Sequence, residues 1–243
     1  MLRVERNDRV ELITLDRPER RNALDHATIL EIVEAQERVA AASLDDVRVV
    51  VLTGAPPAFC AGADLTGVEE GQFATDLGRM LRGFGSLGVP VIAAIDGPAL
   101  GAGTQLVVAC DLRIATPDSV LGIPAAKLGL VVDHWTVRRL AAEFSPSTAR
   151  AMLVAAETST AAELHASGGI HRLGDVDDAM AWAQRLASLA PLTMQAHKVA
   201  LEAGASGVDD DFESLRTAAW ASADADEGRT AFLEKRRPTF TGQ

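Results

Sequence analysis

Apolar residues follow two patterns along the chain: alternation near its start and short continuous runs further on. Alternation over residues 4–15, broken by an Asn7-Asp8 turn, predicts a β-hairpin, because a strand with one covered face turns every second side chain inward. Continuous apolar runs occupy residues 47–53, 91–95 and 112–115. Such runs are typical of strands covered on both faces, so they predict an α/β fold.

Helix-starting signals outline the rest of the chain. Asp25 precedes a helical apolar face, and Thr160 with Glu163 fits a capping box. From about Thr160 onward the chain is mostly helical. Further helices are expected over residues 192–203, 211–222 and 226–236. The sequence therefore predicts a mixed ββα-type core over residues 1–190 and a C-terminal helical region over residues 191–243.

Composition narrows the class of protein. The chain has 243 residues, of which 48% are hydrophobic and 23% charged, which excludes disorder and suits one large core. A net charge of −11 argues against nucleic acid and anionic membranes as partners. The charged start, and the apolar stretches that acidic residues interrupt, argue against membrane insertion. With only two cysteines and no metal-ligand spacing, we expect a cytoplasmic protein that holds no metal.

Two loops rich in small residues follow predicted strands, at residues 58–65 and 96–105. Small residues let a backbone approach a ligand closely, and a glycine-rich helix start offers N–H donors that have no partner within the helix. If the two loops converge, their N–H groups form a two-donor oxyanion hole, which stabilises negative charge on a carbonyl oxygen.

Segments in these loops resemble a known family. FCAGADL, DGPALGAGTQL and ACDLRIA, with LITLDRPERRNAL near the start and FLEKRRPTF near the end, resemble the enoyl-CoA hydratase/isomerase (crotonase) superfamily. The resemblance covers essentially the whole chain, in order. It implies a spiral of ββα units with a C-terminal helical trimerisation region, assembled as a homotrimer or homohexamer. It also implies an acyl-CoA thioester as the ligand, with no separate cofactor.

The resemblance assigns binding roles to individual residues. The backbone N–H groups of Ala63 and Ala102 would form the oxyanion hole. Coenzyme A would be bordered by Ala61, Gly62, Ala63, Asp64, Leu65 and Gly101, and its phosphates would meet Arg20, Arg21 and Lys235. An acidic protein that binds an anionic cofactor needs such local positive charge. The alternative for Arg20, Arg21, Arg236 and Arg237 is that they form solvated charged turns.

The sequence departs from the family at both acid–base positions. The family's hydratases carry one glutamate just after the second loop and another just after a Gly-x-Pro turn. These positions hold Gln105 and Ala125 here. Glutamine has no useful proton affinity at neutral pH, and alanine has none. The chain thus resembles actinobacterial paralogues that lack both catalytic glutamates. We expect an acyl-CoA-binding protein of fatty-acid metabolism without efficient hydratase activity.

One acid remains near these positions. Asp133 falls where dienoyl-CoA isomerases of the superfamily carry a catalytic aspartate, so it and Gln105 are the candidate catalytic side chains. The alternative, which the preference of aspartate for helix starts favours, is that Asp133 caps the helix that follows. The neighbouring His134 and Trp135, and Cys60 in the first loop, are expected to be structural. An enoyl-CoA hydratase or isomerase using Asp133, and an interaction role among lipid-metabolism enzymes, are the competing functions.

Overall fold

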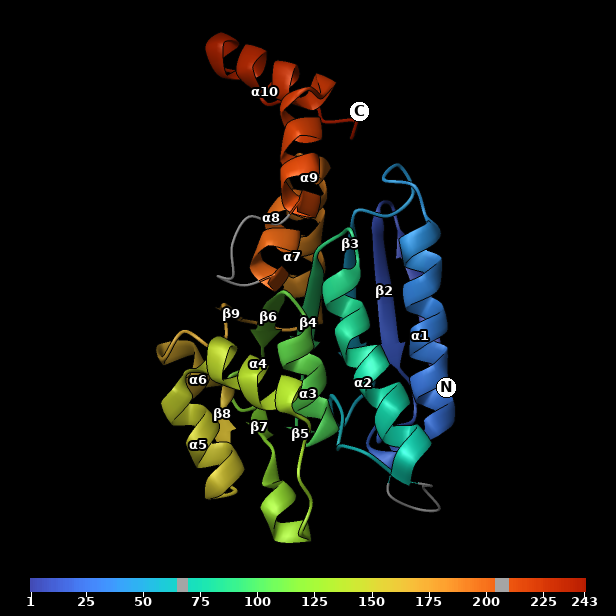
Figure 1. Ribbon diagram of the computed structural model, residues 1–243, viewed down its shortest axis with the longest axis vertical. Helices are drawn as coiled ribbons and strands as arrows, with labels where there is room; N and C mark the ends of the chain where they lie inside the picture. Colours follow the sequence, from blue (N-terminus) through green and yellow to red (C-terminus); the bar gives the residue numbers. More distant parts are fainter. Residues whose placement is uncertain (65–69, 204–209) are drawn as a thin grey trace.

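A six-stranded sheet forms the centre of the computed structural model, which describes residues 1–64, 70–203 and 210–243 (Figure 1). The strand order is β1-β2-β3-β4-β6-β9; β1 and β2 pair antiparallel, and all other neighbours pair parallel. The strands are β1 (Leu2–Asn7), β2 (Val10–Leu15), β3 (Val49–Gly54), β4 (Val91–Ile95), β6 (Leu112–Ala115) and β9 (Arg172–Leu173). The predicted hairpin and all three predicted strands are confirmed; β9 was not predicted.

Helices cover both faces of the inner strands β3 and β4, which is why these two strands are almost entirely apolar and buried along their whole length. Val50 and Leu52 of β3 face α1 (His26–Ala41), α2 (Glu70–Ser86) and α3 (Ala102–Ala109), which lie in front of the strands in Figure 1. Val49 and Val51 face α7 (Val176–Ala187) on the other side. Successive side chains of a strand point to opposite faces, so both sets must be apolar. The predicted α/β fold is confirmed.

A second, smaller sheet is formed by three short strands that follow β4 in the sequence. Its strand β7 (Val120–Gly122) pairs parallel with β5 (Ala99–Leu100) and antiparallel with β8 (Ser159–Thr160). Around this sheet lie α4 (His134–Phe144), α5 (Pro146–Val154) and α6 (Ala161–Ala166), and short 3-10 helices form η1 (Pro18–Arg20) and η2 (Pro124–Leu128).

The helix starts follow the predicted capping chemistry. Asp25 accepts a hydrogen bond from the Thr28 N–H and begins α1. Thr160 and Glu163 form the capping box of α6, each side chain bonding the other's backbone N–H. These short-range caps are present because their partners lie only three residues away.

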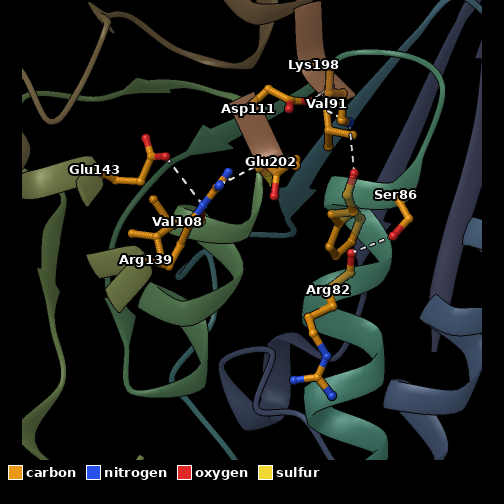
Figure 2. A network of polar contacts seen from close by, with 12 residues as sticks. Arg82, Ser86, Val91, Val108, Asp111, Arg139, Glu143, Lys198 and Glu202 are labelled. Carbon is orange, nitrogen blue, oxygen red and sulfur yellow. Dashed lines mark hydrogen bonds and ion pairs between the residues drawn. The ribbon is translucent and has the colours of Figure 1, made fainter. Parts of the chain in front are cut away.

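The C-terminal helices are α8 (Pro191–Ala203), α9 (Asp210–Trp220) and α10 (Ala223–Glu234). Lys198 joins α8 to the core: its Nζ donates to the Asp111 carboxylate and the Phe84 carbonyl at 2.8 Å, and to the Val89 carbonyl at 2.9 Å (Figure 2). By contrast, α9 and α10 project away from the sheet (Figure 1). In the described segments no helix is both long and apolar enough to cross a bilayer.

The buried ion pair between Lys198 and Asp111 generates a stability prediction. We expect Asp111→Ala to lower the free energy of unfolding by about 3 kcal/mol, because it leaves the ammonium buried without its counter-charge. The Val91 N–H, which donates to Asp111 at 2.7 Å, also loses its acceptor. Denaturant unfolding measures the change, and the exposed Asp118→Ala is the control, expected within about 0.5 kcal/mol of the parent protein. Equal stability of the two variants would contradict this account.

Candidate functional site

A cavity of about 380 Å³ lies between α2, α3, η2 and the start of α4. Its walls are mostly apolar, and they include Phe73, Leu77, Leu81, Leu100, Ile123, Leu128 and Val132. Both predicted loops reach it, the first through residues 61–63 and the second through residues 100–102. The structure therefore brings together the two loops that the sequence singled out. Sequence reasoning missed the wall from α2, although Phe73, Leu77 and Leu81 recur at helical spacing.

The two loops are bonded to each other through their backbones. The Cys60 N–H donates to the Pro98 carbonyl at 3.1 Å, and the Leu100 N–H donates to the Cys60 carbonyl at 2.9 Å. Gly103, in the first turn of α3, lies against the same carbonyl, and a Cβ on this residue would overlap the Cys60 oxygen. Glycine at 103 is therefore what allows α3 to begin directly beside the first loop.

In the first loop, Ala63 lies beside Leu24, and the Ala63 N–H points away from Leu24. Leu24 donates to the Gly62 carbonyl at 2.8 Å and accepts from the Asp64 N–H at 2.8 Å, so it bridges the residues on either side of Ala63. In such a parallel bridge the residue between points its own N–H to the opposite side. Among the described residues the Ala63 N–H has no hydrogen-bond partner, and Ala63 lines the cavity.

In the second loop, Ala102 is the first residue of α3 and also lines the cavity. Gly101, before it, has φ 54° and ψ −116°. Glycine adopts such a positive φ far more readily than other residues, and here it turns the chain into the helix. The Ala102 N–H has no partner in the part of the chain that the structure describes, as is usual in a first helical turn. Two free backbone donors at one cavity can stabilise negative charge on a carbonyl oxygen.

Buried polar contacts that sequence reasoning missed hold the first loop in place. Asn22 donates through Nδ2 to the Ala55 and Ala58 carbonyls, each at 2.7 Å. The Arg17 guanidinium lies 3.0 Å from the Asp25 carboxylate and 3.7 Å from that of Asp64. Burial acts to raise the pKa of Asp25, but the hydrogen bonds from Thr28 and the charge of Arg17 together outweigh it. The pKa of Asp25 is therefore below its usual value.

The Asp64 carboxylate therefore forms an ion pair with the Arg17 guanidinium. Arg20 and Arg21 are exposed and make no side-chain ion pair among the described residues, and the Arg21 carbonyl accepts from the Ala61 N–H at 2.9 Å. These arginines therefore flank the first loop. Leu65 lies outside the described residues. Lys235 ends α10, at the opposite end of the molecule from η2, so the structure does not bring it to the cavity of its own chain (Figure 1).

A chain of polar contacts joins the two polar side chains in the described lining of the cavity, those of Asp133 and Gln105. The Arg82 Nη1 lies 3.6 Å from the Asp133 Oδ2, and the Thr136 N–H donates to the Asp133 Oδ1 at 3.0 Å. The Thr136 hydroxyl in turn donates to the Gln105 Oε1 at 3.3 Å. Ala125 lines the cavity and adds no polar side-chain atom. Asp133 caps α4, as the alternative interpretation predicted, and is also a lining residue of the cavity. Sequence reasoning missed Arg82 and Thr136.

The other residues considered near the loops have structural surroundings. Trp135 is partly buried and packs against the main core, and His134 is an exposed residue in the first turn of α4. Cys60 is fully buried, and its burial raises the pKa of the thiol to about 12. A buried thiol with so high a pKa is not a nucleophile at neutral pH.

An α/β core in which two strand-end loops hold backbone donors over an apolar cavity has the elements that binding of a carbonyl oxygen requires. A family profile described as enoyl-CoA hydratase/isomerase matches residues 5–243. The chain belongs to this family, the crotonase superfamily, and is an enoyl-CoA hydratase-like protein.

Individual relatives agree with this assignment. The chain is 41% identical to a protein of Mycobacterium leprae named as a probable enoyl-CoA hydratase, echA6, with all of both chains covered. It is 34% identical to the 2,3-dehydroadipyl-CoA hydratase of Escherichia coli, over 99% of this chain and 98% of the relative. The crystal structure of an enoyl-CoA hydratase from Bacillus anthracis superimposes with a TM-score of 0.89 at 29% identity, covering 100% of this chain and 99% of the other.

The burial of both cysteines predicts how they react. Burial raises the pKa of Cys110, as of Cys60, to about 12, so at pH 8 the thiolate fraction is on the order of one in ten thousand. We expect a disulfide-exchange reagent such as DTNB to modify neither thiol in the native protein and both after denaturation. Rapid native modification of Cys60, located by mass spectrometry, would contradict the rigid packing of the first loop.

Proposed function

We propose that this protein binds acyl-CoA thioesters, with the thioester oxygen between the N–H groups of Ala63 and Ala102, and that it hydrates enoyl-CoA poorly. The observation that carries the proposal is one cavity lined by Ala63 and Ala102, whose N–H groups have no partner among the described residues, and by Gln105 and Ala125, whose side chains supply no acid or base. Such a site keeps the means to bind a thioester and lacks the means to transfer protons.

Hydration requires two proton transfers, one from water and one to the α-carbon. The two backbone donors stabilise an enolate but leave the attacking water at its bulk acidity. Each positioned acid–base group contributes about 10²–10⁴-fold to a rate, so the absence of both should lower kcat by several decades. Asp133 offers little compensation, because its carboxylate already accepts from the Thr136 N–H and pairs with Arg82.

The coenzyme A arm would cross the first loop. Arg20 and Arg21 flank this loop with exposed guanidinium groups that make no ion pair with the described residues, and such groups suit the phosphates of the ligand. Lys235 would contribute only from a second copy of the chain. The hydratases among the relatives support an acyl-CoA ligand. A cytoplasmic location, a role in fatty-acid metabolism and contacts with other lipid-metabolism enzymes remain predictions.

A second candidate function is acyl-CoA isomerisation with Asp133 as the base. The observation in its favour is that Asp133 is a lining residue of the cavity and that its side chain is 46% exposed. An isomerase would exchange α- or γ-protons of a bound acyl-CoA with solvent. Deuterium exchange that Asp133→Asn abolishes would favour this second function.

Calorimetry and a hydration assay together test the first proposal. We expect a saturated acyl-CoA to bind the wild-type protein, and Ala102→Pro, which removes one donor, to weaken binding. Loss of crotonyl-CoA absorbance should be negligible. The double change Gln105→Glu with Ala125→Glu should raise hydration more than the two single changes combined, because both groups act on one water.

Circular dichroism of Ala102→Pro controls for damage to the start of α3. Absence of acyl-CoA binding by the folded wild type would refute the binding site. Robust wild-type hydration would refute the claim of poor turnover and leave the binding site standing.

The exposed apolar side chains of the C-terminal helices support the homotrimer or homohexamer that the family resemblance implies. These helices expose large apolar side chains, namely Leu201 (79% exposed), Trp220 (66%), Phe232 (83%) and Leu233 (79%). Apolar surface of this kind is typical of an interface. We expect light scattering to give three or six chains at micromolar concentration, and Phe232→Ser with Leu233→Ser to lower the assembly mass. Val154→Ser in α5, where the side chain is equally exposed, is the control. A wild-type monomer would contradict this prediction.

A further inference from the structure

Strand β1 leaves one edge of the main sheet without a neighbouring strand. Within the described residues it is the last strand on its side of the sheet, and it pairs antiparallel with β2. Every residue from Arg3 to Asn7 is exposed, whereas β3 and β4 are fully buried. A free edge presents N–H and C=O groups that can pair with a further strand. This edge is therefore a candidate surface for an extended segment of protein.

The register of the hairpin shows which backbone groups face the free edge. Met1 continues the register opposite Asp16 and accepts from the Asp16 N–H at 3.0 Å, so this pair is hydrogen-bonded. Hydrogen-bonded and non-hydrogen-bonded pairs alternate along an antiparallel ladder. The odd-numbered residues of β1 therefore bond to β2, and the even-numbered residues direct their N–H and C=O groups outward. These outward-facing residues are Leu2, Val4 and Arg6.

The side chains of β1 carry charges of both signs. Arg3 and Glu5 point to the same face of the sheet, and their side chains are 54% and 57% exposed. The Arg3 Nε lies 3.8 Å from the Glu5 Oε2, and neither side chain makes another ion pair among the described residues. Charge on an edge strand commonly opposes pairing. Opposite charges two residues apart act differently, because two antiparallel copies of the strand can place each charge opposite its complement.

Antiparallel pairing of two copies satisfies the backbone and the charges in the register centred on Val4. When Val4 lies opposite Val4 of a second copy, the outward-facing groups of both strands meet, and each Arg3 lies opposite the other Glu5. These are non-hydrogen-bonded positions, where opposed side chains are closest. The neighbouring registers that still match the outward groups place Arg3 opposite Arg3, or Glu5 opposite Glu5, and like charges directly opposite are destabilising.

We propose that β1 binds the β1 of a second copy of this chain, antiparallel and about a two-fold axis at Val4. The occupant is a second copy because the strand is complementary to itself: Arg3 matches Glu5 on one face, and Val4, 39% exposed, matches Val4 on the other. Such a contact is isologous and closed, and it joins the two sheets into one. The inference is independent of the proposed acyl-CoA function.

This edge contact uses residues 2–6 and none of the C-terminal helices, so it is separate from the assembly expected through those helices. A contact across one short strand is weak by itself, but between two trimers several such contacts act together. The edge contact therefore predicts that trimers formed through the C-terminal helices pair into hexamers.

Sedimentation of charge variants at micromolar concentration tests the contact. We expect Glu5→Arg to replace each attractive pair by a repulsive one and to weaken the edge contact about tenfold or more, so that hexamers separate into trimers. Arg3→Glu should do the same. The double change Arg3→Glu with Glu5→Arg restores complementarity in the same register and should restore the hexamer. Glu157→Arg, the same change at an exposed loop position, is the control and should leave the hexamer intact.

The outward direction of the Val4 N–H permits a second test. Val4→Pro removes this N–H without removing a bond to β2, so the hairpin should remain while the hexamer is lost. Hydrogen–deuterium exchange gives a direct readout of the same group. The Val4 amide should exchange more slowly in the wild type than in Glu5→Arg, whereas the Arg3 amide, which bonds to β2, should be protected in both. Circular dichroism confirms that each variant is folded.

The outcomes decide the inference without reference to acyl-CoA binding. A wild-type trimer or monomer would overturn it, as would a Val4 amide that exchanges equally fast in the wild type and in Glu5→Arg. A hexamer that survives Val4→Pro would also overturn it, since another surface would then join the copies. Failure of the charge swap to restore the hexamer would refute the register. A wild-type dimer that Glu5→Arg converts to a monomer would support the edge contact and refute the trimer.

Discussion

The backbone pairing between the loops after β3 and β4 is the constraint on which the whole site depends. Two hydrogen bonds join Cys60 to Pro98 and Leu100, and they exist because parallel strands bring their carboxyl ends to the same edge of the sheet. Once the loops are paired, the first turn of α3 must lie against the Cys60 carbonyl, which requires glycine at 103. Ala63 and Ala102, whose N–H groups have no partner in the described part of the chain, are then held at one cavity.

A second set of contacts makes this arrangement rigid rather than dependent on a ligand. Asn22 satisfies two buried carbonyls of the first loop, and Arg17 links Asp25 to Asp64 at the loop's end. The Asn22 side chain is fully satisfied, because its Oδ1 also accepts from the Arg17 N–H, and a buried polar group satisfied in this way specifies one conformation. Backbone donors fixed before the ligand arrives stabilise charge without the cost of reorganising, which is the property an oxyanion hole requires.

The sheet and the helix starts could be predicted from local signals in the sequence, whereas side-chain contacts between distant residues could not. Asp25 and Thr160 cap helices through atoms three residues away, and the three apolar runs are strands because helices cover both their faces. Asn22, by contrast, acts on carbonyls 33 and 36 positions further along the chain. Thr136 acts on Gln105, 31 positions before it. No spacing rule predicts such pairs, and β9, with two residues, is too short to leave a pattern.

The departure at Gln105 and Ala125 is physically consistent with the rest of the cavity. A carboxylate in an apolar cavity must be paired or protonated, because burial disfavours its charge. The only guanidinium ion-paired to a described cavity-lining side chain is that of Arg82, and it pairs with Asp133, on the far side of Thr136 from Gln105. A neutral amide needs no counter-charge, and the Thr136 hydroxyl is enough to hold it. Among the described residues the acid that lines the cavity is therefore Asp133, which has Arg82 as its counter-charge, while the two positions where the family's hydratases carry glutamates hold side chains that need none.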